Sequence, residues 1–417
     1  MTSSSALGHY RDDCRLCHAK QMVTFLDFGM HPHSDGFLSE EQVKKPEPTF
    51  PLTTDVCAAC GQVQINYIVS PEFLYGGDYF YDGAITETGR KHFLAMAADL
   101  VSRFGFAKER LAIDIGSNVG LLLRGFKEQG LRVQGIDPTP RMTKIAIEQG
   151  LDTITQVFST EVAKRIVTEK GKAAVITGTN VIAHIDDMDD LMAGVKELLD
   201  DDGVFVIEAP YLRTLVEGME YDTIYHQHLS YFSVKPLRAF FARAELELFD
   251  VIRTTIHGGS IRLFVGRPGK HAVTPTIDAM CKEEDALKLH DPASLKAFGE
   301  SVIEHRRKLV RLLTELKEQG KTIAGVGAPA KGSTMLNFCG INRYVLDFTT
   351  EKNKLKIGRY TPGTHIPILT DEELVKRRPD YALILPWNFA TEIMRNLQAY
   401  KDAGGKFILP VPVPTIV

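Results

Sequence analysis

The chain has 417 residues, of which 44% are hydrophobic and 24% are charged, and its formal net charge is −4. This length predicts two or three domains. The nearly balanced charge argues against a nucleic-acid or anionic-membrane partner, because phosphate surfaces select strongly basic faces. No apolar run reaches the roughly 18 residues of a membrane-spanning helix. The N-terminal segment lacks the basic and apolar regions of a signal peptide, so we expect a cytoplasmic protein with reduced cysteines.

Four of the six cysteines form two C-x2-C pairs, Cys14 with Cys17 and Cys57 with Cys60. One such turn places two thiolates on a metal, and two turns complete a tetrahedral zinc shell. Because four cysteines leave no open position for water, the expected zinc is structural. Redox or disulfide CxxC pairs are the alternative. Residues 1–75 are therefore predicted to form a small, loop-rich zinc-binding module.

Residues 76–268 alternate short apolar runs with amphipathic helical stretches. This alternation predicts a Rossmann-like α/β domain, with a parallel sheet and ligands at the carboxyl ends of its strands. The predicted strands are 111–114, 131–137, 153–158, 173–178 and 203–210.

A glycine loop, Asp114-Ile-Gly116-Ser-Asn118-Val-Gly120, follows the first predicted strand. Its glycines let the backbone approach a ligand without a Cβ in the way. Asp137 ends the second strand about 20 residues after Gly116, where a carboxylate can accept ribose hydroxyls. Asp114 can hold the ammonium group of S-adenosylmethionine and would repel the pyrophosphate of NAD, so the methyl donor is favoured over NAD or a bare glycine turn. The expected donor-binding residues are Asp114, Gly116, Asn118, Gly120, Asp137 and Asn180.

Residues 219–233, MEYDTIYHQHLSYFS, are unusually rich in polar and aromatic side chains. They follow the fifth predicted strand, so we expect them near the carboxyl edge where cofactor and substrate meet. Two further clusters are His-Gly-Gly-Ser-Ile-Arg at 257–262 and Asp-Tyr-Phe-Tyr at 78–81.

With these motifs the chain resembles the sugar-nucleotide C-methyltransferases that make 3-C-methylated deoxysugars. The resemblance covers nearly the whole chain. It includes both CxxC pairs, the Asp-Tyr-x-Tyr stretch, the donor loop, Asn180-Val-x-x-His184, DTIYHQHLSYFS, HGGSIR, and the C-terminal runs GVGAPAKG and YTPGTHIPI.

The resemblance implies a 4-keto-6-deoxyhexose nucleotide, usually thymidine-linked, as substrate. It implies that His228 removes the C3 proton and that the resulting enolate takes the donor methyl. Histidine suits this task because its pKa lies near neutrality. The family typically reads Tyr-His-Glu-His, and this chain has Gln227, which cannot carry charge or accept a proton. The candidate catalytic residues are His228, Tyr225, Tyr79, His184 and Gln227, whereas His226 is expected to be structural.

Residues 269–417 are predicted to form a C-terminal α/β, Rossmann-like domain. A helical region over 270–320 is expected to break at Pro292. A strand at 321–324, the Gly325-Val-Gly327 loop and a strand ending at Asp347 follow, which taken alone is a passable dinucleotide fingerprint. The alternatives are thus an NAD-dependent oxidoreductase, a zinc-dependent binding module without catalysis, and a methyltransferase of this fold with a non-sugar or differently linked substrate.

We interpret this C-terminal unit as a relict nucleotide fold that helps to hold the phosphates of the sugar nucleotide. The substrate is expected in a cleft between the domains. We expect a monomer or a weak homodimer. The substrate-binding candidates are Tyr81, His257, Arg262, Lys331 and Asn337. His257 has a turn cap and Tyr81 has core packing as the alternative role.

Overall fold

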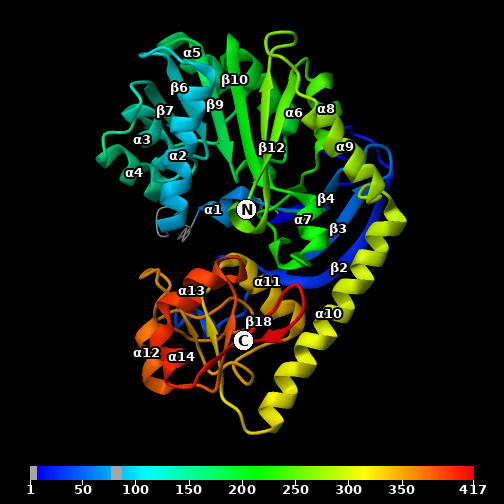
Figure 1. The fold of residues 1–417 in the computed structure, drawn as a ribbon, viewed down its shortest axis with the longest axis vertical. Helices are drawn as coiled ribbons and strands as arrows, with labels where there is room; N and C mark the ends of the chain where they lie inside the picture. Colours follow the sequence, from blue (N-terminus) through cyan, green and yellow to red (C-terminus); the bar gives the residue numbers. More distant parts are fainter. Residues whose placement is uncertain (1–6, 77–86) are drawn as a thin grey trace, which may run out of the picture.

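The computed structural model describes residues 7–76 and 87–417. One α/β unit lies at the top of Figure 1, a second lies at the bottom, and the N-terminal strands lie between them. The 27-residue α10 (Pro292–Glu318) runs along one side from the upper to the lower unit. Within 7–76 and 87–417, no helix combines the length and apolar character needed to cross a membrane.

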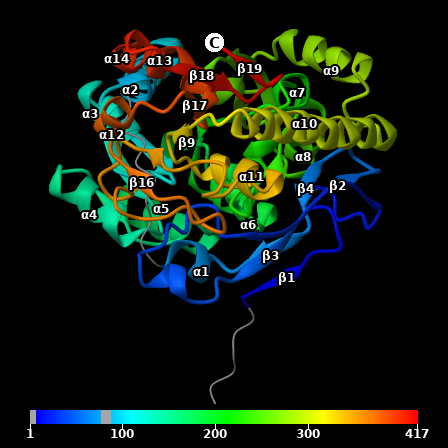
Figure 2. The ribbon, with the colours of Figure 1, turned by 90° about the horizontal axis from the view of Figure 1, so that it is seen from below.

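The N-terminal sheet has four antiparallel strands in the order β11-β4-β3-β2. They are β2 (Met22–Pro32), β3 (Thr49–Cys57), β4 (Val63–Ile65) and β11 (Ser230–Tyr231). Beside them lie β1 (Gly8–Tyr10), β5 (Tyr67–Val69), η1 (Gln42–Lys44) and α1 (Pro71–Tyr75). Figure 2 shows β1 to β4 along one edge of the molecule. β11 comes from residues 219–233, which we call the histidine-rich segment. The predicted zinc module therefore shares its sheet with the middle of the chain.

The middle unit is built on a seven-stranded sheet in the order β12-β13-β10-β9-β6-β7-β8. Its five parallel strands are those predicted from the sequence, although β8 ends at Ile154 rather than at 158. The strands are β6 (Leu111–Ile115), β7 (Arg132–Ile136), β8 (Thr153–Ile154), β9 (Ala173–Thr179), β10 (Leu199–Pro210), β12 (Glu247–Thr254) and β13 (Ser260–Gly266).

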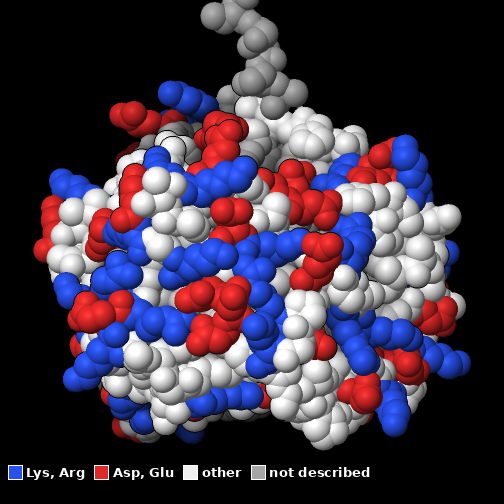
Figure 3. Space-filling model, turned by 90° about the horizontal axis from the view of Figure 1, so that it is seen from above, with Lys and Arg blue, Asp and Glu red and all other residues white. Residues whose placement is uncertain are grey.

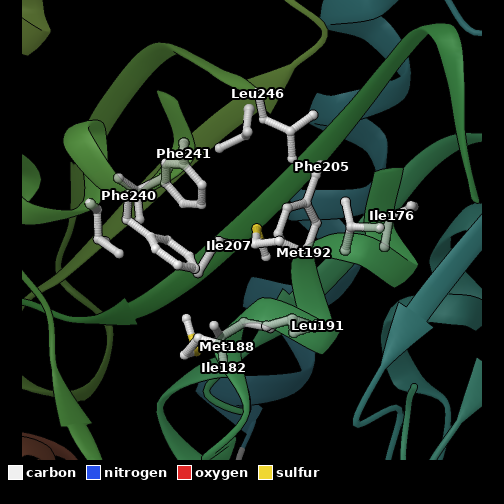
Figure 4. Close-up of a cluster of buried hydrophobic side chains, with 14 of the residues drawn as sticks. Ile176, Ile182, Met188, Leu191, Met192, Phe205, Ile207, Phe240, Phe241 and Leu246 are labelled. Atoms are coloured by element: carbon white, nitrogen blue, oxygen red, sulfur yellow. The ribbon is translucent and has the colours of Figure 1, made fainter. Parts of the chain in front are cut away.

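Helices cover both faces of this sheet, which explains why its central strands are nearly continuously apolar. Alternate residues of β10 point to opposite faces. Phe205 and Ile207 meet side chains of α6 and α8 (Figure 4), whereas Val204 and Val206 pack in the cluster of α2 and α3. The helices are α2 (Glu87–Phe104), α3 (Leu121–Glu128), α4 (Pro140–Glu148), α5 (Thr160–Lys170), α6 (Met188–Leu198), α7 (Leu212–Glu217) and α8 (Val234–Arg243).

Basic and acidic side chains are interspersed on the upper face of the molecule (Figure 3). Ion pairs also occur among the described residues. Arg110 contacts Asp200 at 3.0 Å and Asp202 at 2.7 Å. Neither sign of charge therefore dominates this face.

The predicted helical region after residue 270 is confirmed as α9 (Thr276–Ala286) and α10. Pro292 is the first residue of α10, a position that needs no backbone N–H. The carboxylate of Asp291 caps the helix by accepting from the Ala293 N–H at 3.2 Å. The expected break is therefore a helix start.

The lower unit has a six-stranded sheet in the order β16-β15-β14-β17-β18-β19, parallel except at β19. Its strands are β14 (Ile323–Val326), β15 (Thr349–Thr350), β16 (Ile368–Leu369), β17 (Tyr381–Ile384), β18 (Lys406–Leu409) and β19 (Thr415–Ile416). Its helices are α11 (Ala330–Cys339), α12 (Asp371–Arg377), η5 (Trp387–Phe389), α13 (Ala390–Asn396) and α14 (Gln398–Asp402).

The strand predicted to end at Asp347 is wrong. Residues 343–345 form a turn, Tyr344 is 74% exposed, and the strand beside β14 is Thr349–Thr350. Asp347 instead pairs with Lys317 at 3.6 Å. The acid that follows this strand is Glu351. Its carboxylate accepts from the N–H of Ala328, just after the Gly325-Val-Gly327 loop, at 2.9 Å. β-Branched Thr349 and Thr350 suit a buried strand better than the exposed turn before them.

Candidate active site and zinc site

The four predicted zinc ligands lie together. The sulfur atoms of Cys14, Cys17, Cys57 and Cys60 all lie within 4.8 Å of one another. The Cys14–Cys60 and Cys17–Cys57 sulfur distances are both 3.6 Å. A tetrahedral shell with zinc–sulfur bonds of about 2.3 Å places its sulfurs about 3.8 Å apart. The cluster therefore fits zinc, with all four positions filled by thiolates.

The donor loop lies between β6 and α3. Gly116 has φ +70° and approaches Val181 so closely that a Cβ would lie 2.5 Å from a methyl carbon. Gly120 has φ +77° and caps α3. Both glycines therefore have conformations that a residue with a side chain would adopt only under strain.

Two carboxylates flank this loop. Asp114 is buried on β6 and accepts from the Thr177 hydroxyl at 2.7 Å, and burial raises its pKa to about 7. Asp137 follows β7 and accepts from the backbone N–H groups of Asn118 at 2.9 Å and Thr139 at 2.8 Å. Burial raises the pKa of Asp137 as well. The loop thus offers acidic acceptors to a cationic, hydroxyl-bearing ligand.

Asn180 follows β9, and its backbone N–H donates to the Glu208 carbonyl at 2.8 Å. Its side-chain oxygen is buried and has no hydrogen-bond partner among the described residues, as is also true of the Ser117 hydroxyl. Orphaned buried polar atoms are uncommon and point to a missing ligand or water. These two atoms therefore fit a polar ligand at the loop.

His228 lies between Tyr225 and a backbone carbonyl. Its Nδ1 is 2.8 Å from the Thr223 oxygen, and its Nε2 is 2.8 Å from the Tyr225 hydroxyl. Because a carbonyl only accepts, Nδ1 carries the proton and Nε2 presents a lone pair. The Tyr225 and His228 rings are 4.0 Å apart. This arrangement gives His228 the tautomer of a base that acts through Nε2.

His184 lies 5.1 Å from His228, measured between ring centroids. It ends η2 (Ile182–His184), and its Nε2 is buried without a hydrogen-bond partner within the described part of the chain. Burial lowers its pKa to about 4, so the ring is neutral near pH 7. The Leu229 N–H donates to the Ala183 carbonyl at 2.8 Å and links the two histidine segments.

Gln227 is buried and points to the N-terminal unit instead of solvent. Its side-chain oxygen accepts from the Ser34 hydroxyl at 2.9 Å, and its amide nitrogen lies 2.9 Å from His33 Nε2. Its neighbour His226 contacts the Pro51 carbonyl at 3.1 Å and is also buried. Sequence reasoning missed His33 and Ser34, and a His-x-His run beside Gly36 was the available signal.

The C-terminal unit closes on the same segment through η3 (Tyr221–Thr223). The Trp387 indole donates to the Asp222 carboxylate at 2.7 Å, and the Thr334 hydroxyl donates to the Ile224 carbonyl at 2.9 Å. Burial raises the pKa of Asp222 to about 6 and that of Glu220 to about 8.

Lys331 and Asn337 are both on α11. The Lys331 ammonium donates to Asn388, lies 3.9 Å from the centroid of the Trp387 ring, and has its pKa lowered to about 8 by burial. The amide of Asn337 donates to the carbonyls of Ser333 at 2.8 Å and Pro362 at 3.1 Å. Lys331 therefore faces the histidine-rich segment, whereas Asn337 ties its own unit together.

Arg262 is buried on β13, where Glu208 holds its guanidinium through contacts of 2.9 and 2.8 Å. Glu208 also contacts His92 Nε2 at 2.5 Å, and neither Glu208 nor His92 was predicted. Tyr79 and Tyr81 lie outside the described residues. The side chain of His257 does too, although its backbone forms part of η4 (Ile256–Gly258).

Three family models match the chain. They are a zinc binding domain over residues 14–75, a methyltransferase domain over 89–251, and a C-methyltransferase C-terminal domain over 255–412. The C-methyltransferase NovU of Streptomyces niveus is 34% identical over 407 residues, which cover 97% of this chain and 97% of that protein.

Solved structures match a smaller part of the chain. An S-adenosylmethionine-dependent methyltransferase of Clostridium acetobutylicum is 11% identical, covering 43% of this chain and 92% of that one, with a TM-score of 0.33. The magnesium protoporphyrin IX methyltransferase of Synechocystis, with S-adenosylmethionine bound, is 15% identical, covering 45% and 87%, with a TM-score of 0.34. The relationship therefore rests on the three domain matches and the full-length relative.

Proposed function

The chain belongs to the S-adenosylmethionine-dependent C-methyltransferases that carry an N-terminal zinc binding domain, and we propose that it methylates C3 of a nucleoside diphosphate-4-keto-6-deoxyhexose. One observation supports this proposal most strongly. His228 has its Nδ1 proton held by the Thr223 carbonyl, which leaves Nε2 as an acceptor. Carbon methylation beside a ketone needs a base so placed, because the C–H bond must be broken before carbon can act as a nucleophile.

In the proposed reaction, His228 Nε2 takes the C3 proton of the sugar. The Tyr225 hydroxyl, which now donates to that nitrogen, turns to the substrate when the sugar is bound. The Thr223 carbonyl remains on Nδ1–H and stabilises the imidazolium that forms. His228 thus acts as a general base whose orientation is set by the backbone of η3.

The negative charge that develops on the C4 oxygen needs a hydrogen-bond donor. His184 is neutral and lies beside His228, and its unpartnered Nε2 suits this role. We assign Tyr225 and Tyr79 to the same surroundings of the sugar. Gln227 is assigned to holding the histidine segment against the N-terminal unit.

We assign donor binding to the acidic glycine loop. Asp114 is placed to hold the ammonium group and Asp137 the ribose, with Gly116, Asn118, Gly120 and Asn180 shaping the cradle. Bound S-adenosylmethionine supplies the methyl group as an electrophile for the enolate. Zinc at the four cysteines is structural in this proposal.

Lys331 is our main candidate for the substrate diphosphate, because it is a cation at the start of α11 beside the histidine-rich segment. Tyr81, His257, Arg262 and Asn337 remain proposed substrate-binding residues, although Arg262 and Asn337 are already engaged within the protein. We further propose domain boundaries near residues 75 and 268, a cytoplasmic location, and a monomer or weak homodimer.

A nicotinamide-dependent oxidoreductase and a zinc-dependent binding module without catalysis are set aside, because the family is one of methyltransferases. Asp347, the acid expected to bind the ribose of a nicotinamide cofactor, also precedes the strand Thr349–Thr350 instead of ending it. A substrate other than a keto-sugar nucleotide is the remaining alternative, and it is an outcome of the experiment that follows.

The proposal is tested by incubating the protein with labelled S-adenosylmethionine and a panel of 4-keto-6-deoxy sugar nucleotides. Mass spectrometry of each sugar nucleotide then detects the added methyl group. We expect one sugar to gain a methyl group, and His228→Asn to lower the rate by about 10² to 10⁴-fold, the usual contribution of a general base. His18→Asn, an exposed histidine paired with Asp189, is the matched control. No gain with any sugar, despite binding of S-adenosylhomocysteine, would discard the sugar substrate.

A further inference from the structure

Arg15 lies between the zinc ligands Cys14 and Cys17 and is fully buried, with 0% of the residue exposed. A buried guanidinium is costly unless it is paired and hydrogen-bonded. The backbone N–H of Arg15 donates to the Gln64 side chain at 2.9 Å, so the residue is anchored at its backbone as well. A side chain in this position is held by the metal-binding turn itself.

The guanidinium of Arg15 reaches out of the zinc module to three acceptors. Nε donates to the Asp186 carboxylate at 2.8 Å, and Nη1 donates to the carbonyls of Ile65 at 2.8 Å and Leu229 at 3.1 Å. Leu229 directly follows His228, and Asp186 lies two residues after His184. One side chain therefore bonds to both segments that carry the paired histidines.

The backbone between these acceptors forms one continuous hydrogen-bond network. The Leu229 N–H donates to Ala183, next to His184, and the Leu229 carbonyl accepts from Ile65 as well as from Arg15. Ser230, one residue further, pairs with Gln64 in the sheet. A shift of the Cys14–Cys17 turn would therefore reach both histidines within a few bonds.

We propose that Arg15 is a positioning residue that transmits the geometry of the zinc-binding turn to His228 and His184. Arg15 is fully buried and its side-chain bonds go to protein groups, so we assign it an indirect role. Its role is to fix the distance and angle between the two histidines, and this role rests on the proposed function of that pair. Misplacement of reacting groups by about 1 Å can cost about 10²-fold in rate, so a positioning residue is expected to affect kcat more than donor binding.

Two measurements on the zinc-loaded full-length protein test this assignment. The first is hydrogen–deuterium exchange in Arg15→Met, which keeps the length of the side chain but removes its donors. We expect faster exchange in peptides covering 62–66 and 225–231 and unchanged exchange in the donor loop at 114–120. Removal of zinc by a chelator should speed exchange in the same peptides.

The second measurement is the methyl-transfer rate. Arg15→Met should lower kcat by about 10²-fold, with KM for S-adenosylmethionine within a factor of two, and Arg15→Lys should restore part of the loss. Arg11→Met is the matched control, because the Arg11 side chain also contacts Asp186, at 3.1 Å, and within the described residues it bonds to neither Leu229 nor Ile65. It should leave exchange at 225–231 and kcat nearly unchanged.

The exchange measurement needs no substrate, so it distinguishes this proposal from the proposed function. Faster exchange at 225–231 without any sugar methylation would support Arg15 as a positioning residue and would exclude the proposed sugar substrate. Unchanged exchange in folded Arg15→Met and Arg15→Lys, or equal effects in Arg11→Met, would overturn the proposal that Arg15 positions the two histidines. If Arg15→Met does not fold, Arg15→Lys and zinc removal carry the same comparison.

Discussion

The pair formed by Gln227 and His33 joins two residues 194 positions apart, and it sits one residue from the proposed base. Ser34 donates to the amide oxygen of Gln227, so the amide nitrogen faces His33 Nε2 as a donor. A neutral amide suits a neutral histidine here, and burial lowers the pKa of His33 below its ordinary value of 6.5. The pair is therefore uncharged near neutral pH.

Gln227→Glu places a carboxylate against His33 and should raise the pKa of that histidine. In the wild type, burial lowers the pKa of His33, so the unfolded chain binds a proton at this residue more readily than the folded protein. The free energy of unfolding therefore decreases as the pH falls below about 6.5. In the variant, this decrease in the free energy of unfolding at low pH should be smaller, because the Glu carboxylate favours the protonated His33 ring. NMR titration of the His33 ring measures the effect.

Gln227→Met, which has similar length and no hydrogen bonds, is the control for that titration. It should leave the pKa of His33 low. An unchanged or lower His33 pKa in Gln227→Glu would show that the carboxylate does not face the ring.

Side-chain types were the predictable part of the candidate site. Glycines, acids and histidines at strand ends predict a binding site at the carboxyl edge of a parallel sheet. Strands β6, β7 and β9 place these residues at that edge. Partners from distant segments were not predictable. His33, Arg15 and Glu208 meet their partners through the sheet order β11-β4-β3-β2 and the pairing of β10 with β13, which local patterns do not encode.

At the scale of elements, η3 is the contact point between the histidine-rich segment and the C-terminal unit. Its Asp222 is buried, receives the Trp387 indole, and interacts with the Lys331 ammonium. Burial outweighs both partners and raises the pKa of Asp222 to about 6. Ionisation of this carboxyl therefore costs stability as the pH rises from about 4 through about 6.

Asp222→Asn keeps an acceptor for Trp387 and removes that cost. The free energy of unfolding of the variant, relative to the wild type, should increase between pH 5 and pH 7 by at most about 1.4 kcal/mol, because only one pH unit of this interval lies below the pKa of about 6 and one unit is worth about 1.4 kcal/mol. Loss of the counter-charge for Lys331 offsets part of this gain. Urea unfolding at both pH values measures it.

Asp12→Asn, at an exposed ion pair with Lys20, is the control for the unfolding experiment. Its difference from the wild type should stay small at both pH values. A pH-independent difference for Asp222→Asn would mean that this carboxyl stays ionised throughout the range.

Element prediction succeeded where burial alone determines structure. The runs that became β6, β9 and β10 are mostly apolar because helices cover both sheet faces. It failed at 344–347, where the apolar-looking run continues a turn at 343–345 without forming a strand and the two-residue β15 follows it. Two β-branched residues carry too little periodic signal to identify a strand.

At the scale of the whole molecule, three units meet on residues 220–232. The N-terminal unit binds this segment through Arg15, Ser34 and the β4–β11 pairing. The C-terminal unit binds it through Thr334 and Trp387. Figure 1 shows this layout, with the N-terminal strands between the two α/β units. The segment with the proposed base is thereby held from more than one side, as a preorganised site requires.

The most direct test of the central claim follows the substrate proton itself. A 4-keto-6-deoxy sugar nucleotide is incubated in D2O with the protein and S-adenosylhomocysteine, and the C3 proton is followed by NMR. We predict that the wild type exchanges this proton for deuterium and that His228→Asn does not, while both bind S-adenosylhomocysteine equally. Exchange at an unchanged rate in His228→Asn, or methyl transfer by the wild type without any exchange at C3, would contradict the account.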